Sequence, residues 1–295
     1  MSIVNGSVEQ FLLDRLGYIQ DQHFPDSDVI TYYGPIEYWS KNLFRQQLEA
    51  FSQSDSGNKK NLLIILNTGG GSAEVVEKMV EMTRHFYTNV DFLVPDLAMS
   101  AGTIWCMSGN RIFMDYSSSL GPIDPQVQNN EGKWVPALGY LDKCNELISR
   151  SSNGQTLSNA ELVMLNTLDL ASLRAYEQAR DLSISLLKKW LVEFKFRDWN
   201  NHRSCPHKRG QVVTADEKSQ RAEEIAQMLS DNNRWHSHGR MIGIKTLQND
   251  LKLEIDDFTG NTTLRNDVNM LHDFCNDYMY KMNRIVLVGS KHRLC

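Results

Sequence analysis

The stretch that decides the fold is Val94-Pro95-Asp96-Leu97-Ala98-Met99-Ser100-Ala101-Gly102-Thr103-Ile104, in which an apolar strand runs into a turn of small residues and then a helix. An earlier stretch, Asn67-Thr68-Gly69-Gly70-Gly71-Ser72, makes the same transition after an apolar run at 62–66. Consecutive glycines let a backbone approach a ligand closely and turn its amides toward an anion, and the following helix adds the positive end of its dipole. The glycine turn lacks both the lysine of a P-loop and the G-x-G-x-x-G of a dinucleotide fold. We therefore interpret it as an oxyanion or phosphate cradle.

Ser100 is the candidate nucleophile of the first stretch. A serine at a strand-to-helix junction between small neighbours is accessible to a substrate, and the helix N-terminus stabilises negative charge on the attacked carbonyl oxygen. Taken alone, Ser100 would be an ordinary N-cap and the glycines an ordinary tight turn. The two motifs together favour catalysis over these structural interpretations.

The surrounding sequence alternates short apolar runs with amphipathic helices. The second run has no polar alternation, which is typical of a central strand buried on both faces. Alternation of strands and helices predicts a largely parallel sheet flanked by helices. The predicted strands are 29–33, 62–66, 90–94 and 111–114, and the predicted helices are 38–51, 73–86, 162–196 and 215–229, the last with Thr214 as its N-cap.

Composition excludes several classes of protein. Of the 295 residues 41% are hydrophobic, which is enough for a sizeable core, and a net charge of -5 argues against a dedicated nucleic-acid binder. The five cysteines are scattered without a CxxC pair, so we expect reduced thiols and a cytoplasmic location. No stretch is long and apolar enough to predict a membrane span, and the N-terminus has no signal-peptide pattern.

Together with Leu120-Gly121-Pro122-Ile123-Asp124-Pro125-Gln126, the two motifs resemble the ClpP/crotonase fold and, within it, the serine dehydrogenase proteinases, or Clp-fold serine proteinases. The resemblance covers 29–126 and resumes more loosely over 175–190 and 235–242. It implies an α/β ClpP/crotonase-like fold with repeated β-β-α units and a helical insertion. The expected organisation is a helical segment at 1–27, a ClpP/crotonase-like domain at 28–258 with insertions at about 127–172 and 197–214, and a C-terminal helical extension at 259–295.

The resemblance also implies an activity. It makes the chain a serine hydrolase, a peptidase that cleaves peptide bonds through an acyl-enzyme on Ser100, with an oxyanion hole formed by the amides of Gly70 or Gly71 and of Ala101. Peptides or unfolded proteins are the implied substrates, a homo-oligomer is the implied assembly, and no cofactor is implied. Two alternatives stay open. One is a crotonase-like acyl-CoA enzyme whose amides stabilise an enolate, and the other is a binding or assembly protein that has lost its base.

The general base is the open part of the site. ClpP carries a catalytic histidine shortly after the nucleophile helix, whereas this sequence has no histidine between Phe86 and Asn201, and the ClpP aspartate falls near Asn233. One replacement is a desolvated lysine with a lowered pKa, for which Lys143, Lys188 and Lys189 are candidates, although each fits a solvated helix charge.

The other replacement is His238, in Trp235-His236-Ser237-His238-Gly239, where relatives carry a histidine. An imidazole needs only a modest shift in pKa to act as a base at neutral pH, and we prefer His238 to any single lysine.

A zinc site is a competing interpretation of the histidines. The imidazoles and one thiolate could hold the metal, but the H-x-x-C-x-H spacing is not a standard zinc pattern, and we expect no metal. The residues concerned are His202, Cys205, His207, His236 and His238.

Overall fold

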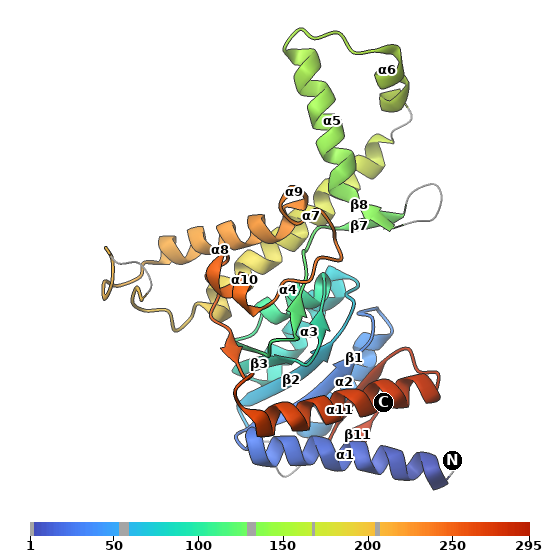
Figure 1. The fold of residues 1–295 in the computed structure, drawn as a ribbon, viewed down its shortest axis with the longest axis vertical. Helices are drawn as coiled ribbons and strands as arrows, with labels where there is room; N and C mark the ends of the chain where they lie inside the picture. Colours follow the sequence, from blue (N-terminus) through green and yellow to red (C-terminus); the bar gives the residue numbers. More distant parts are fainter. Residues whose placement is uncertain (1–2, 53–58, 129–133, 167–168, 204–206) are drawn as a thin grey trace.

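The computed structural model describes residues 3–52, 59–128, 134–166, 169–203 and 207–295 and is built around a seven-stranded sheet (Figure 1). The strand order is β11-β10-β1-β2-β3-β5-β9. Strands β1 to β9 of this sheet are parallel, whereas β10 runs antiparallel to β1 and β11 antiparallel to β10. The bounds are β1 Ser27–Tyr33, β2 Asn61–Asn67, β3 Asn89–Val94, β5 Arg111–Met114, β9 Asp256–Asp257, β10 Leu287–Ser290 and β11 Arg293–Leu294.

Helices cover both faces of the sheet. On one face α1 (Ile3–His23) and α11 (Thr262–Lys281) lie side by side, at the bottom of Figure 1. On the other face lie α2 (Ser40–Ser52), α3 (Ala73–Phe86) and α4 (Ala101–Met107). Strand residues alternate between two separate apolar clusters, one under each helical layer, as the period of two requires.

The core on the α4 face centres on Trp105. Its fully buried indole makes edge-to-face contacts with Tyr32, Phe44 and Phe92, at ring-centroid distances of 5.2, 5.2 and 5.8 Å. Such aromatic pairs add stability beyond their buried area. Helix α4 is therefore anchored firmly in the core, and the turn that precedes it is held in place.

A second, smaller layer lies at the carboxyl ends of the central strands. Strand β4 (Leu97–Ala98) pairs in parallel with β6 (Ser119–Leu120), and Thr68 forms an isolated parallel bridge with Ala98. Helices that complete the body on this side are η1 (Leu191–Lys195), α8 (Ala215–Ser230), α9 (Asn232–Trp235) and α10 (Ile244–Asn249).

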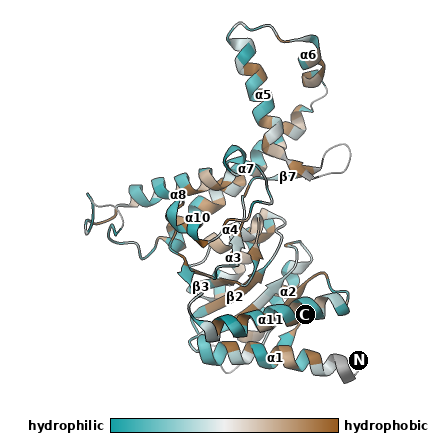
Figure 2. Ribbon diagram, viewed as in Figure 1, coloured by the Kyte–Doolittle hydropathy of each residue, from teal (hydrophilic) through white to brown (hydrophobic). Residues whose placement is uncertain are grey.

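An arm projects from the body, at the top of Figure 1. It consists of the hairpin β7 (Gln126–Gln128) and β8 (Trp134–Pro136), the helices α5 (Ala137–Ser152) and α6 (Asn159–Asn166), and the start of α7 (Leu170–Trp190). Helix α6 has no buried residue although apolar side chains lie along it, as the brown segments at the top of Figure 2 show.

The expected α/β fold class with its helical insertion is confirmed. The predicted helix 73–86 coincides with α3, but the stretch 162–196 contains the end of α6, all of α7 and the short η1. Segment 259–295, expected as a helical extension, also supplies β10 and β11 to the central sheet. Within the described ranges, no helix combines the length and the hydropathy that crossing a bilayer requires.

Candidate active site

Ser100 lies in the turn between β4 and α4 with an unusual backbone. Its φ of 53° and ψ of -117° fall in a region that non-glycine residues rarely adopt and that costs free energy. Although Ser100 occupies the N-cap position of α4, its side chain makes no capping hydrogen bond. Ser72, at the same position of α3, does cap its helix by accepting from the N–H of Val75. The half-buried Ser100 hydroxyl is thus left available for another role.

The turn around Ser100 is fixed by its neighbours. The N–H of Gly102 donates to the Met99 carbonyl at 2.8 Å. The Thr103 hydroxyl donates to the carbonyl of Ala98 at 2.8 Å and lies 2.9 Å from both the carbonyl and the N–H of Gly121. These contacts tie the strained turn to the segment that follows β6.

The glycine cradle lies directly against Ser100. Gly70 has a φ of 109°, and a Cβ on it would lie 2.9 Å from both the Met99 carbonyl oxygen and the Ser100 Cβ. Gly71 has a φ of 148°, and a Cβ there would overlap the carbonyl of Ile36. Both glycines therefore need their conformational freedom, and the cradle is confined between Ile36 and the nucleophile.

The three amides predicted for the oxyanion hole differ in their partners. The N–H of Gly70 donates to the Thr68 hydroxyl at 3.0 Å. In the part of the chain that the structure describes, the N–H groups of Gly71 and Ala101 donate to no acceptor. The Ala101 residue is 2% exposed, and a buried N–H without a partner is rare outside functional sites.

His238 forms a pair with a buried carboxylate. Its Nδ1 lies 2.9 Å from Oδ1 of Asp124, whose residue is only 1% exposed, while the imidazole side chain is 21% exposed. The other oxygen of Asp124 accepts from the Gln126 amide at 2.9 Å. The buried carboxylate fixes the orientation of the imidazole, and no described residue bonds to its Nε2.

The backbone explains why these two distant residues meet. Leu120 and Ile242 form an antiparallel bridge with two hydrogen bonds of 3.0 and 2.8 Å. Counting four residues away from that bridge along each segment leads to Asp124 and His238. Because Ala98 pairs with Leu120 in the β4–β6 ladder, Ser100 belongs to the same layer of structure. Asp124 was not named as a catalytic candidate from the sequence, although it lies in the quoted segment 120–126.

The predicted lysine bases lie elsewhere. Lys143, on α5 in the arm, donates to Glu146, and Lys188, on α7, forms an ion pair with Glu223 at 2.5 Å. Lys189, also on α7, is exposed. Among the described residues, none of these three lysines contacts a member of the Ser100 cluster.

One further lysine has a lowered pKa but the wrong location. Burial lowers the pKa of Lys195 to about 8, against the opposing influence of nearby carboxylates. Its Nζ donates to the carbonyl of Asn110. The N–H of Asn110 donates to the carbonyl of Val90, which places Lys195 near the amino end of β3. Ser100 follows the carboxyl end of that strand, roughly 13 Å away at about 3.3 Å per residue.

The zinc candidates that the structure describes are not gathered into one site. Among the described residues no group of three or more histidine, cysteine, aspartate or glutamate side chains is arranged to hold a metal. His202 pairs with Glu217 at 3.2 Å, and His236 is the left-handed C-cap of α9. Cys205 lies outside the described residues. Asp231, near the position of the ClpP aspartate, caps α9 through the N–H groups of Asn233 and Arg234.

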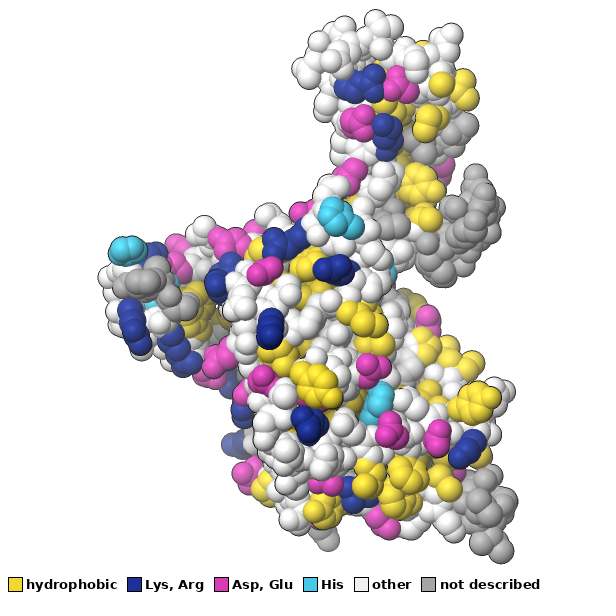
Figure 3. Space-filling view, viewed as in Figure 1, with side chains coloured by type: hydrophobic (Ala, Val, Ile, Leu, Met, Phe, Trp, Pro, Cys, Tyr) yellow, Lys and Arg dark blue, Asp and Glu magenta, His cyan; other side chains and the backbone are white. Residues whose placement is uncertain are grey.

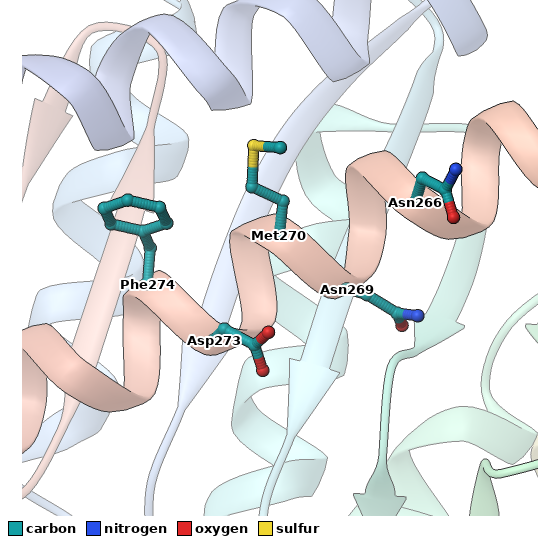
Figure 4. A pocket seen from close by; sticks show the side chains of 5 residues that line it. All are labelled: Asn266, Asn269, Met270, Asp273 and Phe274. Carbon is teal, nitrogen blue, oxygen red and sulfur yellow. The ribbon is translucent and has the colours of Figure 1, made fainter.

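A surface hollow of about 480 Å³ on α11 shares no residue with this cluster. Figure 4 shows that Met270 and Phe274 point to one side of the helix and Asn269 and Asp273 to the other. The hollow is therefore separate from the candidate active site.

Comparison with known proteins shows a family and several relatives. The sequence profile of a family described as ClpP-like SDH-type serine proteinase matches residues 48–203. Two proteins of Methanocaldococcus jannaschii are similar to this chain: the uncharacterized protein MJ1495, 26% identical over 125 residues (42% of this chain and 38% of that protein), and the uncharacterized protein MJ0137, 25% identical over 139 residues (47% and 44%). The chain thus spans less than half the length of these curated relatives.

Two solved structures are also similar to this chain. Both are mutants of a membrane-bound stomatin-specific protease called 1510-N, one of them in complex with a substrate peptide. The complex is 24% identical with a TM-score of 0.33 and covers 39% of this chain and 55% of that one. The second is 22% identical with a TM-score of 0.34 and covers 45% and 66%.

Proposed function

The chain belongs to the ClpP-like SDH-type serine proteinase family, and on that premise we propose that it hydrolyses peptide bonds with Ser100 as nucleophile and the His238–Asp124 pair as base. The observation that carries this assignment is the 2.9 Å contact between His238 Nδ1 and the buried carboxylate of Asp124. This pair supports the assignment of a general base, which neither the glycine turn nor the Ser100 turn contains.

The proposed chemistry is acyl transfer to water. Ser100 Oγ attacks the peptide carbonyl carbon while Nε2 of His238 takes the hydroxyl proton, which it then gives to the leaving amine. Water next attacks the acyl-enzyme while His238 takes a proton from it, and His238 then returns that proton to Ser100 Oγ as the bond between Oγ and the acyl carbon breaks and the carboxylic acid leaves. Asp124 accepts from Nδ1–H throughout, which holds the imidazole in the tautomer that presents a basic Nε2. The reaction requires Nε2 to come within hydrogen-bond reach of the Ser100 hydroxyl when substrate binds.

We assign the oxyanion hole to the N–H groups of Gly71 and Ala101. Both are without an acceptor in the described structure, and the Ala101 amide also lies at the positive end of α4. Gly70 contributes shape, because a side chain on it would overlap the Met99 carbonyl oxygen and the Ser100 Cβ.

Substrate, assembly and location belong to the same proposal. We propose peptides or unfolded polypeptides as substrates, in keeping with the family description. The stacked β4–β6 layer supports a place in the ClpP/crotonase superfamily. Free thiols at Cys106, Cys144, Cys275 and Cys295 support a reducing, cytoplasmic location.

We propose a homo-oligomer assembled through the arm. Leu162 and Val163 on α6 and Leu170 at the start of α7 are 46%, 62% and 79% exposed, and Figure 3 shows apolar side chains on the arm. Exposed apolar residues on a projecting element mark a surface for a partner protein.

Labelling by a fluorophosphonate probe tests the nucleophile. Mass spectrometry is expected to locate the label on Ser100, and Ser100→Ala is expected to abolish both labelling and hydrolysis of unstructured protein and small esters. Ser185→Ala is the matched control, since Ser185 is an exposed serine on α7. An unlabelled parent that hydrolyses neither substrate contradicts the proposal and favours the binding protein, or the acyl-CoA enzyme if it binds that ligand.

A further inference from the structure

Thr68 is the residue that joins the glycine cradle to the nucleophile turn. It directly follows β2, and its residue is 2% exposed. Its hydroxyl accepts the N–H of Gly70 at 3.0 Å and lies 3.4 Å from the Gly70 carbonyl. One buried side chain therefore contacts both the N–H and the carbonyl of Gly70 in the cradle.

The backbone of Thr68 holds the other motif. Its N–H donates to the carbonyl of Leu97 at 2.9 Å, and its carbonyl accepts from the N–H of Met99 at 2.9 Å. These two bonds form the isolated parallel bridge to Ala98. Thr68 is thus fixed to the strand that ends two residues before Ser100.

The methyl group of Thr68 makes a third connection. A Cβ added to Gly102 would overlap Thr68 Cγ2, so the threonine methyl fills the space next to the second residue of α4. The hydroxyl contacts the cradle, the backbone contacts β4 and the methyl contacts the nucleophile helix. All of these contacts of Thr68 are with other residues of the protein.

We propose that Thr68 is a positioning residue for the oxyanion hole, an inference that rests on the proposed hydrolase function. By occupying the N–H of Gly70, its hydroxyl sets the orientation of the following peptide units and leaves the Gly71 amide directed at the reacting carbonyl beside Ser100. Catalysis by preorganised amides depends on such placement, because a displacement of about 1 Å costs roughly 100-fold in rate.

Two substitutions separate the hydroxyl from the methyl. Thr68→Val keeps the shape and removes the acceptor, whereas Thr68→Ser keeps the acceptor and removes the methyl. The matched control is Thr83→Val on α3, where a threonine with the same 2% exposure donates to the Met79 carbonyl at 2.7 Å. All three variants lose a small buried group, but only Thr68→Val releases the Gly70 amide.

The kinetic test separates kcat from KM. We expect Thr68→Val to lower kcat on an unstructured protein substrate by roughly 10- to 100-fold with KM within about twofold. Thr68→Ser is expected to recover kcat to within about threefold of the parent, and Thr83→Val to leave it unchanged. Equal losses in the valine and serine variants, or a kcat in Thr68→Val like that of the parent, would overturn the proposal.

Amide hydrogen exchange, followed by NMR, tests the same inference without activity. We expect the Gly70 N–H to exchange slowly in the parent and in Thr68→Ser, and at least about tenfold faster in Thr68→Val. An exchange rate unaffected by the valine would contradict the role of the hydroxyl even if hydrolysis is observed. In a parent without hydrolytic activity, the exchange result still decides whether Thr68 holds the cradle, while the proposed function alone fails.

Discussion

At the residue scale, the catalytic assignment depends on the surroundings of two side chains, those of Ser100 and His238. Ser100 occupies a helix N-cap yet leaves its hydroxyl without a capping bond, and it holds a positive φ. His238 is only partly exposed and contacts a carboxylate that is almost fully buried. Backbone strain and burial of a polar group both cost free energy, and both features support the proposed catalytic role.

We expect His238→Asn to lower kcat by about 100- to 10,000-fold, the range for loss of a general base, with little change in thermal stability. His236→Asn is the control, because His236 lies two residues away in a left-handed conformation that asparagine tolerates. Steady-state kinetics on both variants check the prediction. Equal activity in the two variants would exclude His238 as the base.

Asp28 offers a prediction about pH. Burial raises the pKa of this carboxyl, with the Tyr87 hydroxyl donating to Oδ2 at 2.9 Å and Oδ1 without a partner among the described residues. A folded-state pKa above the unfolded value favours the protonated form. The stability linked to Asp28 is therefore complete in acid and is lost as pH rises through the folded pKa.

Asp28→Asn removes this penalty and should raise the midpoint of thermal unfolding at pH 7, by about 1.4 kcal/mol of stability for each unit by which the pKa is raised. The advantage should vanish below the pKa of the unfolded chain. Asp26→Asn, at an exposed neighbouring position, should show no such dependence in the same melting curves. A gain that is independent of pH would contradict the linkage.

The sequence named Ser100 and His238 as candidates, whereas the partner of His238 was found only in the structure. Ser100 could be found because its neighbours at 98–103 carry the signal locally. Asp124 is 114 residues away from His238, and their contact follows from the bridge between Leu120 and Ile242, which no local pattern predicts. The sequence pattern does not show which residues of distant segments pair with each other, and the Leu120–Ile242 pairing is such a case.

At the element scale, the turn after β2 determines the shape of the site. We expect Gly70→Ala to lower kcat/KM by about 100-fold, because its φ of 109° is strained for alanine and its Cβ would displace Ser100 or Met99. Gly69→Ala is the matched control, since no atom lies within 4 Å of a Cβ there. Similar activities in the two alanine variants would show that the cradle does not act on the reaction.

Helices with their own start signals were predictable. Ser72 caps α3 and Thr214 forms a capping box with Glu217 at α8, and these helices begin at the residues expected. The place of β10 beside β1 was not predicted, because pairing partners are not encoded locally. The division of α6 from α7 was also missed, since the apolar spacing alone does not mark where α6 ends.

At the scale of the whole molecule, the arm places the proposed assembly surface away from the body that contains the proposed active site. We expect the double variant Leu162→Glu and Val163→Glu to dissociate the proposed oligomer, because charged side chains would be desolvated at the interface. Light scattering coupled to size-exclusion chromatography measures the mass. Since α6 buries no residue, the unfolding midpoint of the subunit should stay within a few degrees of the parent. A parent that is already monomeric would contradict the assembly proposal.

The antiparallel neighbour of β1 has a consequence for biosynthesis. Thr31 pairs with Gly289, so one edge of an early, apolar strand stays uncovered while nearly all of the intervening polypeptide is translated. Unpaired edges of this kind recruit other strands, and pairings between distant segments form slowly. The nascent chain is therefore expected to require protection by chaperones until the hairpin of β10 and β11 emerges from the ribosome and closes the sheet.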